Sequence, residues 1–582
     1  MDIGQQNETW ANELINTLLT QGIDYFCCGP GSRSTPLALA VARLSESLHT
    51  VHFDERGVCF HAVGYGKASG KPAVVITTSG TAVGNLLPGI MEACNQRVPL
   101  IILTADRPPE LRDCGANQTC DQVKLFANHV RWQIDLPCPS EHIPKHYLAS
   151  TICQAVAISQ SSPAGPVHIN CMFREPLFSL QEKTRSAQVK IKAFAHPELH
   201  PSSETVDFWL EALSDVEKGV IIAGSNSDDS SRAILALAEQ LQWPVFADIL
   251  SGPRGVGEHN CLIPHFDSIL KSKGEIKADA IIQFGDRFVS KTLAQWLEKQ
   301  TPQFYLHISE HPLRQDPFHL ITHRVHASAT LFVQKLLKSL PPREEEQWLT
   351  QWSLWDQKCR ELLSDLFAKD FKESITEPSL IPPIASLLSE DWALFLANSM
   401  PIRDANLFFN SQISCGPIFG NRGVSGIDGN IATAAGIAKA TRKPTLALLG
   451  DLAFLHDLNS LAYLNKIDLP LLLCVVNNGG GGIFSFLPIS QRGESFEKFF
   501  AAAHEITFAP AAALFGIPYF HATSLSELKE LFFEQKKSPR SCIIEITTDR
   551  AQNVQIHESI NAAISRCLNS ACSPEETLAI LH

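Results

Sequence analysis

The sequence predicts an α/β protein built from three doubly wound parallel-sheet domains. Short apolar runs alternate with helical segments along the chain, which is the pattern of parallel strands covered by helices. With 582 residues, 45% hydrophobic and 19% charged, the chain is long enough for several packed cores and too apolar to be disordered. Polar segments marked by proline divide it into blocks, and each block is predicted to fold as one domain.

The first domain is predicted to span residues 1–190. Its strand candidates are residues 24–28, 73–78 and 100–104, because each is a short apolar run followed by a turn that contains glycine or proline. The polar segment at residues 179–205 then predicts a linker.

The second domain, predicted at residues 200–345, shows the same alternation. Gly224 follows a predicted strand, but the GxGxxG fingerprint of a dinucleotide site is absent, so this domain is expected to bind no cofactor. An amphipathic helix is predicted at residues 231–241. The predicted strands are residues 219–223, 245–248, 280–284 and 304–308.

The third domain is predicted at residues 375–582, after a charged helical stretch at residues 343–372. Residues 445–449 and 471–476 are continuous apolar runs, which are typical of strands buried on both faces of a parallel sheet. Residues 542–547 are predicted to form a later strand of the same sheet.

Composition narrows the class of protein. The formal net charge of −13 disfavours binding to nucleic acid or to an anionic membrane surface, because both require basic surface. The polar N-terminus predicts no secretory signal, and no apolar run approaches the roughly 20 residues of a membrane span. The 16 cysteines are scattered without a CxxC pair or zinc-ligand spacing, which indicates reduced thiols. A cytoplasmic protein is therefore expected.

The sharpest local signal is a pair of polar strand ends in the third domain. Asp451 follows one buried strand candidate, and Asn478 follows the next. The carboxyl ends of neighbouring parallel strands meet at one edge of a sheet, and Mg²⁺ prefers oxygen ligands such as carboxylates and amides. The pair therefore outlines a site for Mg²⁺ and a diphosphate. Alternatively, these residues simply end strands and form turns, as they commonly do.

The separation of Asp451 and Asn478 resembles the signature of thiamine-diphosphate-dependent enzymes, normally GDG followed by a distant Asn-Asn, although Leu452 replaces the last glycine. Further motifs make essentially the whole chain similar to one family of these enzymes, the SEPHCHC synthases (MenD). Generic thiamine-dependent decarboxylases do not share this set. The motifs are residues 29–36 (GPGSRSTP), 105–111 (ADRPPEL), 115–118 (GANQ) and 421–429 (NRGVSGIDG).

The resemblance implies domains of the thiamine-diphosphate-enzyme type, with a pyrimidine-binding (PYR) first domain and a diphosphate-binding (PP) third domain. The implied activity is that of a transferase in menaquinone or phylloquinone biosynthesis. Such an enzyme decarboxylates 2-oxoglutarate and adds the succinyl-semialdehyde unit to isochorismate, giving 2-succinyl-5-enolpyruvyl-6-hydroxy-3-cyclohexene-1-carboxylate and CO₂. The implied cofactors are thiamine diphosphate and Mg²⁺, with Mn²⁺ as an alternative ion. A homodimer or homotetramer is expected, with the cofactor at the subunit interface.

The resemblance also implies which residues hold the cofactor. Glu55 would hydrogen-bond the aminopyrimidine ring and so activate the cofactor, and Ile427 would hold the cofactor in its bent form. The metal ligands would be Asp451, Asn478 and the carbonyl of Gly480, and Leu452 and Gly481 would complete the cofactor-binding set. Taken alone, Glu55 would be assigned as a carboxylate that stabilises the start of a helix, and the metal signature shifts the assignment to catalysis.

Both implied substrates are dianions, so guanidinium groups that bind carboxylates bidentately are expected in one cleft. The candidates are Arg33, Arg107, Arg403 and Arg422, although any single arginine is commonly part of an ordinary ion pair. Further implied substrate-binding residues are Ser32, Asn117, Gln118, Lys291, Ser399, Ile483 and Phe484, and Arg33 and Gln118 join Glu55 as catalytic residues. For Lys291 and Ser399, a surface lysine and a helix-capping serine are equally plausible.

Two other functions stay open at this point. Another thiamine enzyme, acetolactate-synthase-like or a simple 2-oxo acid decarboxylase, would share Glu55 and the metal residues but not the acceptor substrate. A non-catalytic relative would keep only the fold, and the presence of Glu55, Asp451 and Asn478 argues against it.

Overall fold

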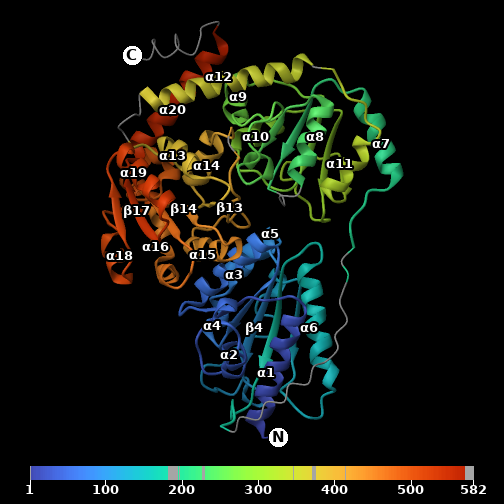
Figure 1. Cartoon of the computed structure of the whole chain (residues 1–582), viewed down its shortest axis with the longest axis vertical. Helices are drawn as coiled ribbons and strands as arrows, with labels where there is room; N and C mark the ends of the chain where they lie inside the picture. Colours follow the sequence, from blue (N-terminus) through green and yellow to red (C-terminus); the bar gives the residue numbers. More distant parts are fainter. Residues whose placement is uncertain are drawn as a thin grey trace.

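The computed structural model describes residues 2–180, 195, 197–225, 230–344, 346–369, 375–412 and 414–570. Its three sheets form three lobes with helices packed around them (Figure 1), which confirms the predicted fold class. The predicted linker at residues 179–205 falls largely on residues 181–194 and 196, which lie outside the described residues. The domain boundaries therefore stay a prediction.

The first sheet has six strands in the order β2-β1-β3-β4-β6-β5, and all neighbouring strands are parallel. Strands β3, β4 and β6 are buried along their whole length, as expected for a sheet covered by helices. The strands are β1 (Phe26–Cys28), β2 (His49–Val51), β3 (Ala73–Thr77), β4 (Leu100–Asp106), β5 (Trp132–Leu136) and β6 (Pro166–Met172). The main helices are α1 (Ile3–Thr20), α2 (Thr35–Ala42), α3 (Glu55–Ser69), α4 (Thr81–Gly84), α5 (Leu87–Gln96) and α6 (Lys145–Gln160).

The second sheet has five parallel strands in the order β11-β10-β9-β7-β8. Helix α8 has the predicted bounds, and its buried residues Ile234, Ala238 and Leu241 follow the helical period. The strands are β7 (Gly219–Ala223), β8 (Val245–Ala247), β9 (Ala280–Phe284), β10 (Phe304–Ser309) and β11 (His323–His326). The helices are α7 (Ser203–Ser214), α8 (Ser231–Leu241), α9 (Phe266–Lys273), α10 (Lys291–Leu297) and α11 (Ala329–Leu337).

The third sheet, in the order β13-β12-β14-β15-β17-β16, repeats the arrangement of the first when strands are counted along the chain. Helix α15 therefore takes the place in this domain that α3 takes in the first. The strands are β12 (Ala393–Leu396), β13 (Ile418–Gly420), β14 (Thr445–Gly450), β15 (Leu471–Asn477), β16 (Tyr519–Ala522) and β17 (Cys542–Thr547). The main helices are α13 (Ile381–Leu387), α14 (Met400–Phe408), α15 (Asn430–Thr441), α16 (Asp451–His456), α18 (Ala509–Phe515), α19 (Leu525–Lys537) and α20 (Arg550–Asn569).

Helices α3 and α15 pack against each other and join the first domain to the third (Figure 1). Two glycines allow the close crossing: a Cβ added to Gly64 would lie 2.1 Å from the carbonyl oxygen of Thr433, and one added to Gly436 would lie 2.1 Å from that of His61. Beside the crossing, the His61 ring stacks on Tyr463 with centroids 4.4 Å apart. The start of α3, which carries Glu55, is thus held against the third domain of the same chain.

The long helix α12 (Gln347–Lys369) runs across the central and third lobes (Figure 1). It begins at Gln347, four positions later than the predicted helical stretch. Its buried Trp352 packs against Phe246 of the second sheet, with ring centroids 4.8 Å apart. None of the helices in the described ranges is long and apolar enough to cross a bilayer. The cysteines of the same ranges are all free.

Candidate functional site

The carboxyl ends of β14 and β15 bring Asp451 and Asn478 together. The strands are parallel neighbours, with Gly450 paired to Val476. The Oδ2 atom of Asp451 accepts hydrogen bonds from the backbone N–H of Asn478 at 3.2 Å and of Gly480 at 2.8 Å. The structure therefore places the two residues side by side, and their role as metal ligands stays a prediction.

Asp451 is almost fully buried, with 2% of its surface exposed. Burial raises the pKa of its carboxyl, whereas the N–H groups of Gly480 and Leu452 act in the opposite direction by favouring the charged form. The Leu452 N–H donates to Oδ1 at 2.6 Å. Residue 452 lies inside helix α16, so its backbone is helical and a leucine is accommodated there without strain.

The side chain of Asn478 has one bonded end and one free end. Its Nδ2 donates to Oε1 of Glu377 at 2.8 Å, whereas its Oδ1 is buried without a hydrogen-bond partner. A buried amide oxygen normally has a hydrogen-bond partner, so an unpartnered one, on a residue whose backbone N–H bonds Asp451, fits an oxygen-seeking cation. The donor set, one carboxylate and one amide next to a glycine-rich turn, suits Mg²⁺ with diphosphate oxygens completing its shell.

The turn after Asn478 can be made only by glycine at one position. Gly480 has φ +142°, and a Cβ there would lie 2.4 Å from the carbonyl oxygen of Ala501. Next to it, the Gly481 N–H donates to the same carbonyl at 2.6 Å. This close backbone approach excludes a side chain at position 480 and fixes the turn against Ala501.

Glu55 begins helix α3 and is half-buried beside Gly29 of the first domain. Neighbouring residues hold this helix start to the third domain, because Asn459 donates to Asp54 at 3.0 Å and Arg56 donates to the His456 carbonyl at 2.7 Å. No hydrogen bond or ion pair links Glu55 to Asp451 or Asn478 in the parts of the chain that the structure describes. Its predicted role is therefore untested by the single chain.

Two of the predicted arginines are neighbours in the first domain. Arg33, 6% exposed, donates to the Phe173 carbonyl at 3.0 Å and to Glu175 at 2.8 Å, and its buried Nε has no partner. Arg107, 8% exposed, donates to the Gln118 carbonyl at 2.8 Å. Burial lowers the pKa of Arg107, and the charge of Arg33 lowers it further. The carboxylates of Glu175, which pairs with Arg33, and of Asp106 offset part of this effect on Arg107.

The other two arginines are neighbours in the third domain. Arg422 donates to Oδ1 of Asn398 at 2.7 Å, and Arg403 donates to the Ser399 carbonyl at 2.5 Å. Burial lowers the pKa of Arg403, and Arg422 adds to this effect. The four arginines thus form two pairs, one in each outer domain, and their meeting in a single cleft stays a prediction.

The loop residues of the first domain lie around Arg107. Ser32 and Asn117 are exposed, and Gln118, with φ +53°, donates from Nε2 to the Ser79 carbonyl at 3.0 Å. Beneath them, Asn170 of β6 donates to Asp106 at 2.9 Å. A buried polar network therefore supports the loops that carry these predicted substrate-binding residues.

Lys291 and Ser399 are placed less tightly. Lys291 is exposed at the start of α10, and Arg287 of the same loop donates to the Gly423 carbonyl at 2.8 Å, so this loop touches the segment that carries Arg422. Ser399 precedes α14 with φ +75°, but its side chain makes no capping hydrogen bond. The helix-capping alternative for Ser399 is therefore wrong.

Three apolar residues of the predicted site remain accessible. Ile427 is 36% exposed, Phe484 is 37% exposed and Ile483 is half-buried. None of the three belongs to a core cluster of the chain. They are therefore available to contact a ligand or a second subunit.

Sequence reasoning missed several ionisable residues around the site. Glu377 bonds Asn478, and His504 lies with Nε2 3.4 Å from Oδ2 of Asp451. Glu92 accepts from the N–H groups of Gly423 and Val424, each at 2.9 Å, so a first-domain carboxylate holds the loop beside Arg422. Such residues are isolated in the sequence, and only long-range packing gives them partners.

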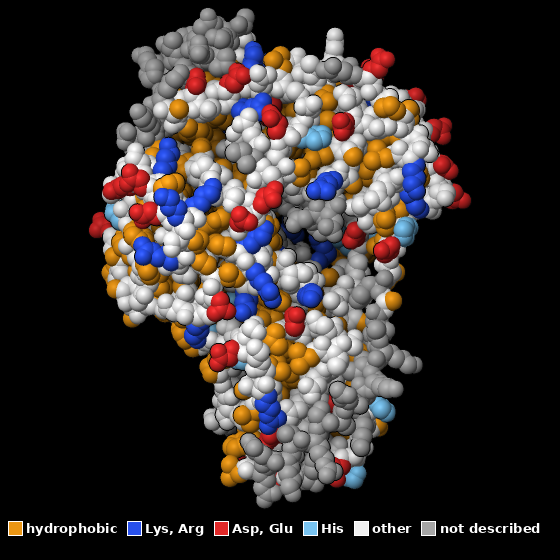
Figure 2. All heavy atoms as spheres, in the orientation of Figure 1, with side chains coloured by type: hydrophobic (Ala, Val, Ile, Leu, Met, Phe, Trp, Pro, Cys, Tyr) orange, Lys and Arg blue, Asp and Glu red, His pale blue; other side chains and the backbone are white. Residues whose placement is uncertain are grey.

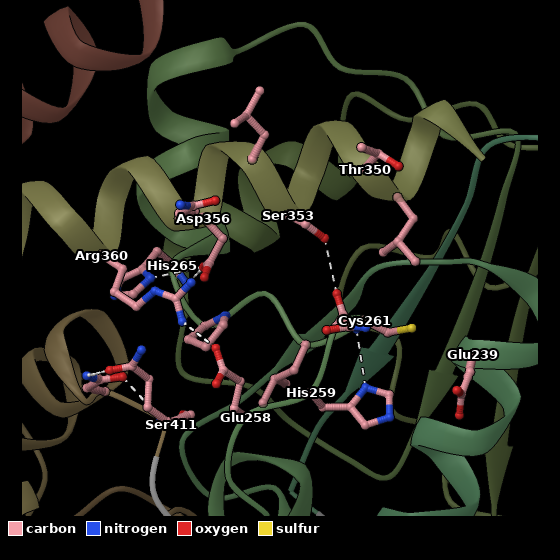
Figure 3. A pocket seen from close by; sticks show the side chains of 18 of the residues that line it. Glu239, Glu258, His259, Cys261, His265, Thr350, Ser353, Asp356, Arg360 and Ser411 are labelled. Atoms are coloured by element: carbon pink, nitrogen blue, oxygen red, sulfur yellow. Dashed lines mark hydrogen bonds and ion pairs between the residues drawn. The ribbon is translucent and has the colours of Figure 1, made fainter. Parts of the chain in front are cut away.

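A cavity of about 850 Å³ lies away from all of these residues, between the central domain and α12 (Figure 3). Two pairs of its ionisable side chains bond each other, since Arg360 bonds Glu258 at 2.9 Å and the His265 ring bonds Asp356 at 3.0 Å. It contains none of the predicted site residues. By contrast, Lys and Arg side chains gather around the hollow where the first domain meets the two other lobes (Figure 2).

Three protein families match consecutive parts of the chain. The N-terminal TPP binding domain of thiamine pyrophosphate enzymes matches residues 8–125, the family described as the middle domain of thiamine pyrophosphate matches residues 178–396, and the C-terminal TPP binding domain matches residues 410–546. These matches follow the order of the three sheets.

Similar proteins include two that carry the name 2-succinyl-5-enolpyruvyl-6-hydroxy-3-cyclohexene-1-carboxylate synthase. The one from Salinibacter ruber is 39% identical and covers 98% of both chains, and the one from Rubrobacter xylanophilus is 38% identical over 95% of this chain and 98% of its own. The chloroplastic protein PHYLLO of Arabidopsis thaliana is 34% identical over 99% of this chain and 36% of its own length. Benzoylformate decarboxylase from Polynucleobacter necessarius has a similar structure, with a TM-score of 0.73 and 16% sequence identity. The match covers 93% of this chain and 99% of that one, so the two proteins share a fold.

Proposed function

We propose that this chain, which belongs to the 2-succinyl-5-enolpyruvyl-6-hydroxy-3-cyclohexene-1-carboxylate (SEPHCHC) synthase family of thiamine pyrophosphate enzymes, catalyses the synthesis of SEPHCHC in menaquinone or phylloquinone biosynthesis. It would join the decarboxylated unit of 2-oxoglutarate to isochorismate and release CO₂. The observation that carries the proposal is that Asp451 and Asn478 meet at two neighbouring strand ends, where the Asn478 side-chain oxygen is buried without a partner. The family resemblance drawn from the sequence is confirmed.

In this proposal Asp451, Asn478 and the Gly480 carbonyl hold Mg²⁺, or Mn²⁺ in its place. The peptide groups of Gly480 and Gly481 lie against the diphosphate, with Leu452 beside them and Ile427 against the organic part of the cofactor. Glu55 holds and returns a proton at the pyrimidine nitrogen, a task that suits a half-buried carboxyl. Bound thiamine diphosphate supplies the carbanion stabilisation that lets a 2-oxo acid lose CO₂ and form a new carbon–carbon bond.

The two arginine pairs fit two dianionic substrates. Arg33 and Arg107 in one domain, and Arg403 and Arg422 in another, would each bind carboxylates through planar guanidinium forks. Ser32, Asn117, Gln118, Lys291 and Ser399 would add polar contacts, and Arg33 and Gln118 would orient the reacting atoms. Ile483 and Phe484 would exclude water on the apolar side, which favours loss of a charged carboxylate as neutral CO₂.

The cofactor site is proposed to form between two copies of the chain, with Glu55 supplied by one copy and Asp451 by the other. Glu55 is not bonded to Asp451 within the described part of one chain, and Ile427 and Phe484 stay exposed there. A dimer or tetramer in which the first domain of one subunit faces the third domain of another would complete the site. Mixing inactive Glu55→Gln and Asp451→Asn subunits should then restore activity, and the absence of any restoration contradicts a shared site.

The decisive experiment incubates purified protein with 2-oxoglutarate, isochorismate, thiamine diphosphate and Mg²⁺, and follows both CO₂ and the succinylated cyclohexene product. We expect both to form in equal amounts. CO₂ without the cyclohexene product would contradict the proposed acceptor and favour a simple decarboxylase. A cytoplasmic location stays a prediction.

A further inference from the structure

The buried carboxylate of Glu377 lies directly behind Asn478. Glu377 is 5% exposed and precedes α13, about one hundred positions before Asn478 in the sequence. Its Oε1 accepts the Asn478 Nδ2–H at 2.8 Å and the Thr548 hydroxyl at 3.3 Å. None of the motifs that identify the family contains this residue.

An asparagine amide presents either its oxygen or its NH₂ group to a given side, and its neighbours decide which one. A carboxylate oxygen accepts hydrogen bonds, so Glu377 draws the NH₂ group of Asn478 toward itself. The amide oxygen must then face away from Glu377, and it is buried there without a partner. If the amide turned over, an NH₂ group would face the cation, which repels it.

The rest of Asn478 is already fixed. Its N–H donates to Asp451 at 3.2 Å, and its carbonyl accepts from Nε of Arg550 at 3.2 Å. The side-chain orientation is therefore the remaining freedom, and Glu377 removes it.

Glu377 is itself held in place. Thr376 and Ser379 bond reciprocally around it, with the Thr376 N–H donating to the Ser379 hydroxyl at 2.8 Å and the Ser379 N–H donating to the Thr376 hydroxyl at 3.3 Å. This arrangement resembles a capping box and fixes the backbone from which the carboxylate projects. The acceptor is thus set by a rigid turn.

We propose that Glu377 is a positioning residue that orients the Asn478 amide so that its oxygen faces the cation. This inference rests on the proposed function, because it assumes that a divalent cation binds beside Asp451. Groups that orient a metal ligand typically contribute about 10–100-fold to metal affinity. Glu377 would act in this way without touching metal, cofactor or substrate.

The test measures Mn²⁺ binding to the full-length protein in the presence of thiamine diphosphate, by the loss of the free-ion electron paramagnetic resonance signal. Glu377→Met removes the acceptor at nearly constant volume and should weaken Mn²⁺ binding about 10–100-fold. Glu377→Gln keeps one acceptor oxygen and should stay within about fivefold of the wild type. Thr548→Val removes the other hydrogen bond to Glu377 and, as a matched control, should stay within about threefold.

Glu377→Asp withdraws the acceptor by one methylene and carries the test if the methionine variant does not fold. It should weaken Mn²⁺ binding about tenfold, with circular dichroism like that of the wild type. Equal affinity of the wild type and of every folded Met or Asp variant overturns the inference, as does a Gln variant as weak as the Met variant. If the wild type itself binds no Mn²⁺ with thiamine diphosphate, the proposed function fails instead.

Discussion

Acid should loosen the contact between the first and third domains through His52. This side chain is 0% exposed next to the start of α3, with its ring centroid 4.4 Å from that of Tyr463. Neither ring nitrogen has a hydrogen-bond partner. Burial lowers the pKa of His52 to about 4, with Asp54 acting to raise it and Lys466 to lower it.

The size of the effect follows from linkage between protonation and folding. Below pH 6.5 the unfolded chain binds a proton at His52, whereas the folded chain binds it only below about pH 4. The free energy of unfolding therefore decreases as the pH falls from 6.5 to 4. At pH 5 the penalty from this residue is about 2 kcal/mol, and it is absent above pH 7. In a unit of 150–250 residues that corresponds to a loss of roughly 4–8 °C in the unfolding temperature.

The assay compares unfolding temperatures of the wild type and His52→Leu at pH 7.5 and pH 5.0, without ligands. Leucine has a similar volume and leaves no buried nitrogen unsatisfied, so it should not destabilise the protein at pH 7.5. Between pH 7.5 and pH 5.0, the unfolding temperature of His52→Leu should fall by roughly 4–8 °C less than that of the wild type. The exposed His146 of α6 provides the control, since His146→Leu should leave the drop unchanged. Equal drops for His52→Leu and the wild type would refute the linkage.

The remaining predictions concern the site. Glu55→Gln should lower kcat about 10²–10⁴-fold while the Kd for thiamine diphosphate stays within about threefold, and undiminished turnover removes Glu55 from catalysis. Arg107→Lys should raise the KM of a substrate about 10–100-fold with unchanged cofactor affinity, because lysine cannot form the planar fork; equal losses of both would indicate misfolding instead. Gly480→Ala should weaken cofactor-dependent Mg²⁺ binding about 10-fold or more, measured by calorimetry, because its Cβ would lie 2.4 Å from Ala501. Gly84→Ala, where nothing lies within 4 Å, is the control for that variant, and equal binding by the two contradicts the steric argument.

Most of the central strands could be predicted because their pattern is local. Strands β7, β9 and β17 have the predicted bounds, since each is a short, mainly apolar run that lies in the interior of a sheet. The edge strands β2, β5, β11, β13 and β16 were missed because they are short and half-exposed, and pairing with a neighbour, rather than composition, makes them strands.

Two interior strands, β6 and β12, were missed as well. Strand β6 is fully buried yet contains His168 and Asn170. Their polar groups are satisfied by Thr104, which lies within 2.7 Å of the His168 ring and donates to Asn170 at 2.9 Å. A buried polar strand is stable only with such partners, and the partners come from another part of the chain. Strand β12 has four residues, too few for a periodic pattern.

The sequence by itself determined the three-domain α/β class, most of the central strands, the polar strand ends at Asp451 and Asn478, and the family to which the chain belongs. These depend on neighbouring residues and on motif spacing. Only the tertiary structure decided that the four arginines form two pairs, that Glu377 lies behind Asn478, and that α3 packs on α15 of its own chain. The physical reason is that hydrogen bonds and charge contacts between distant residues depend on how whole sheets and helices pack, and no local pattern in the chain specifies that packing.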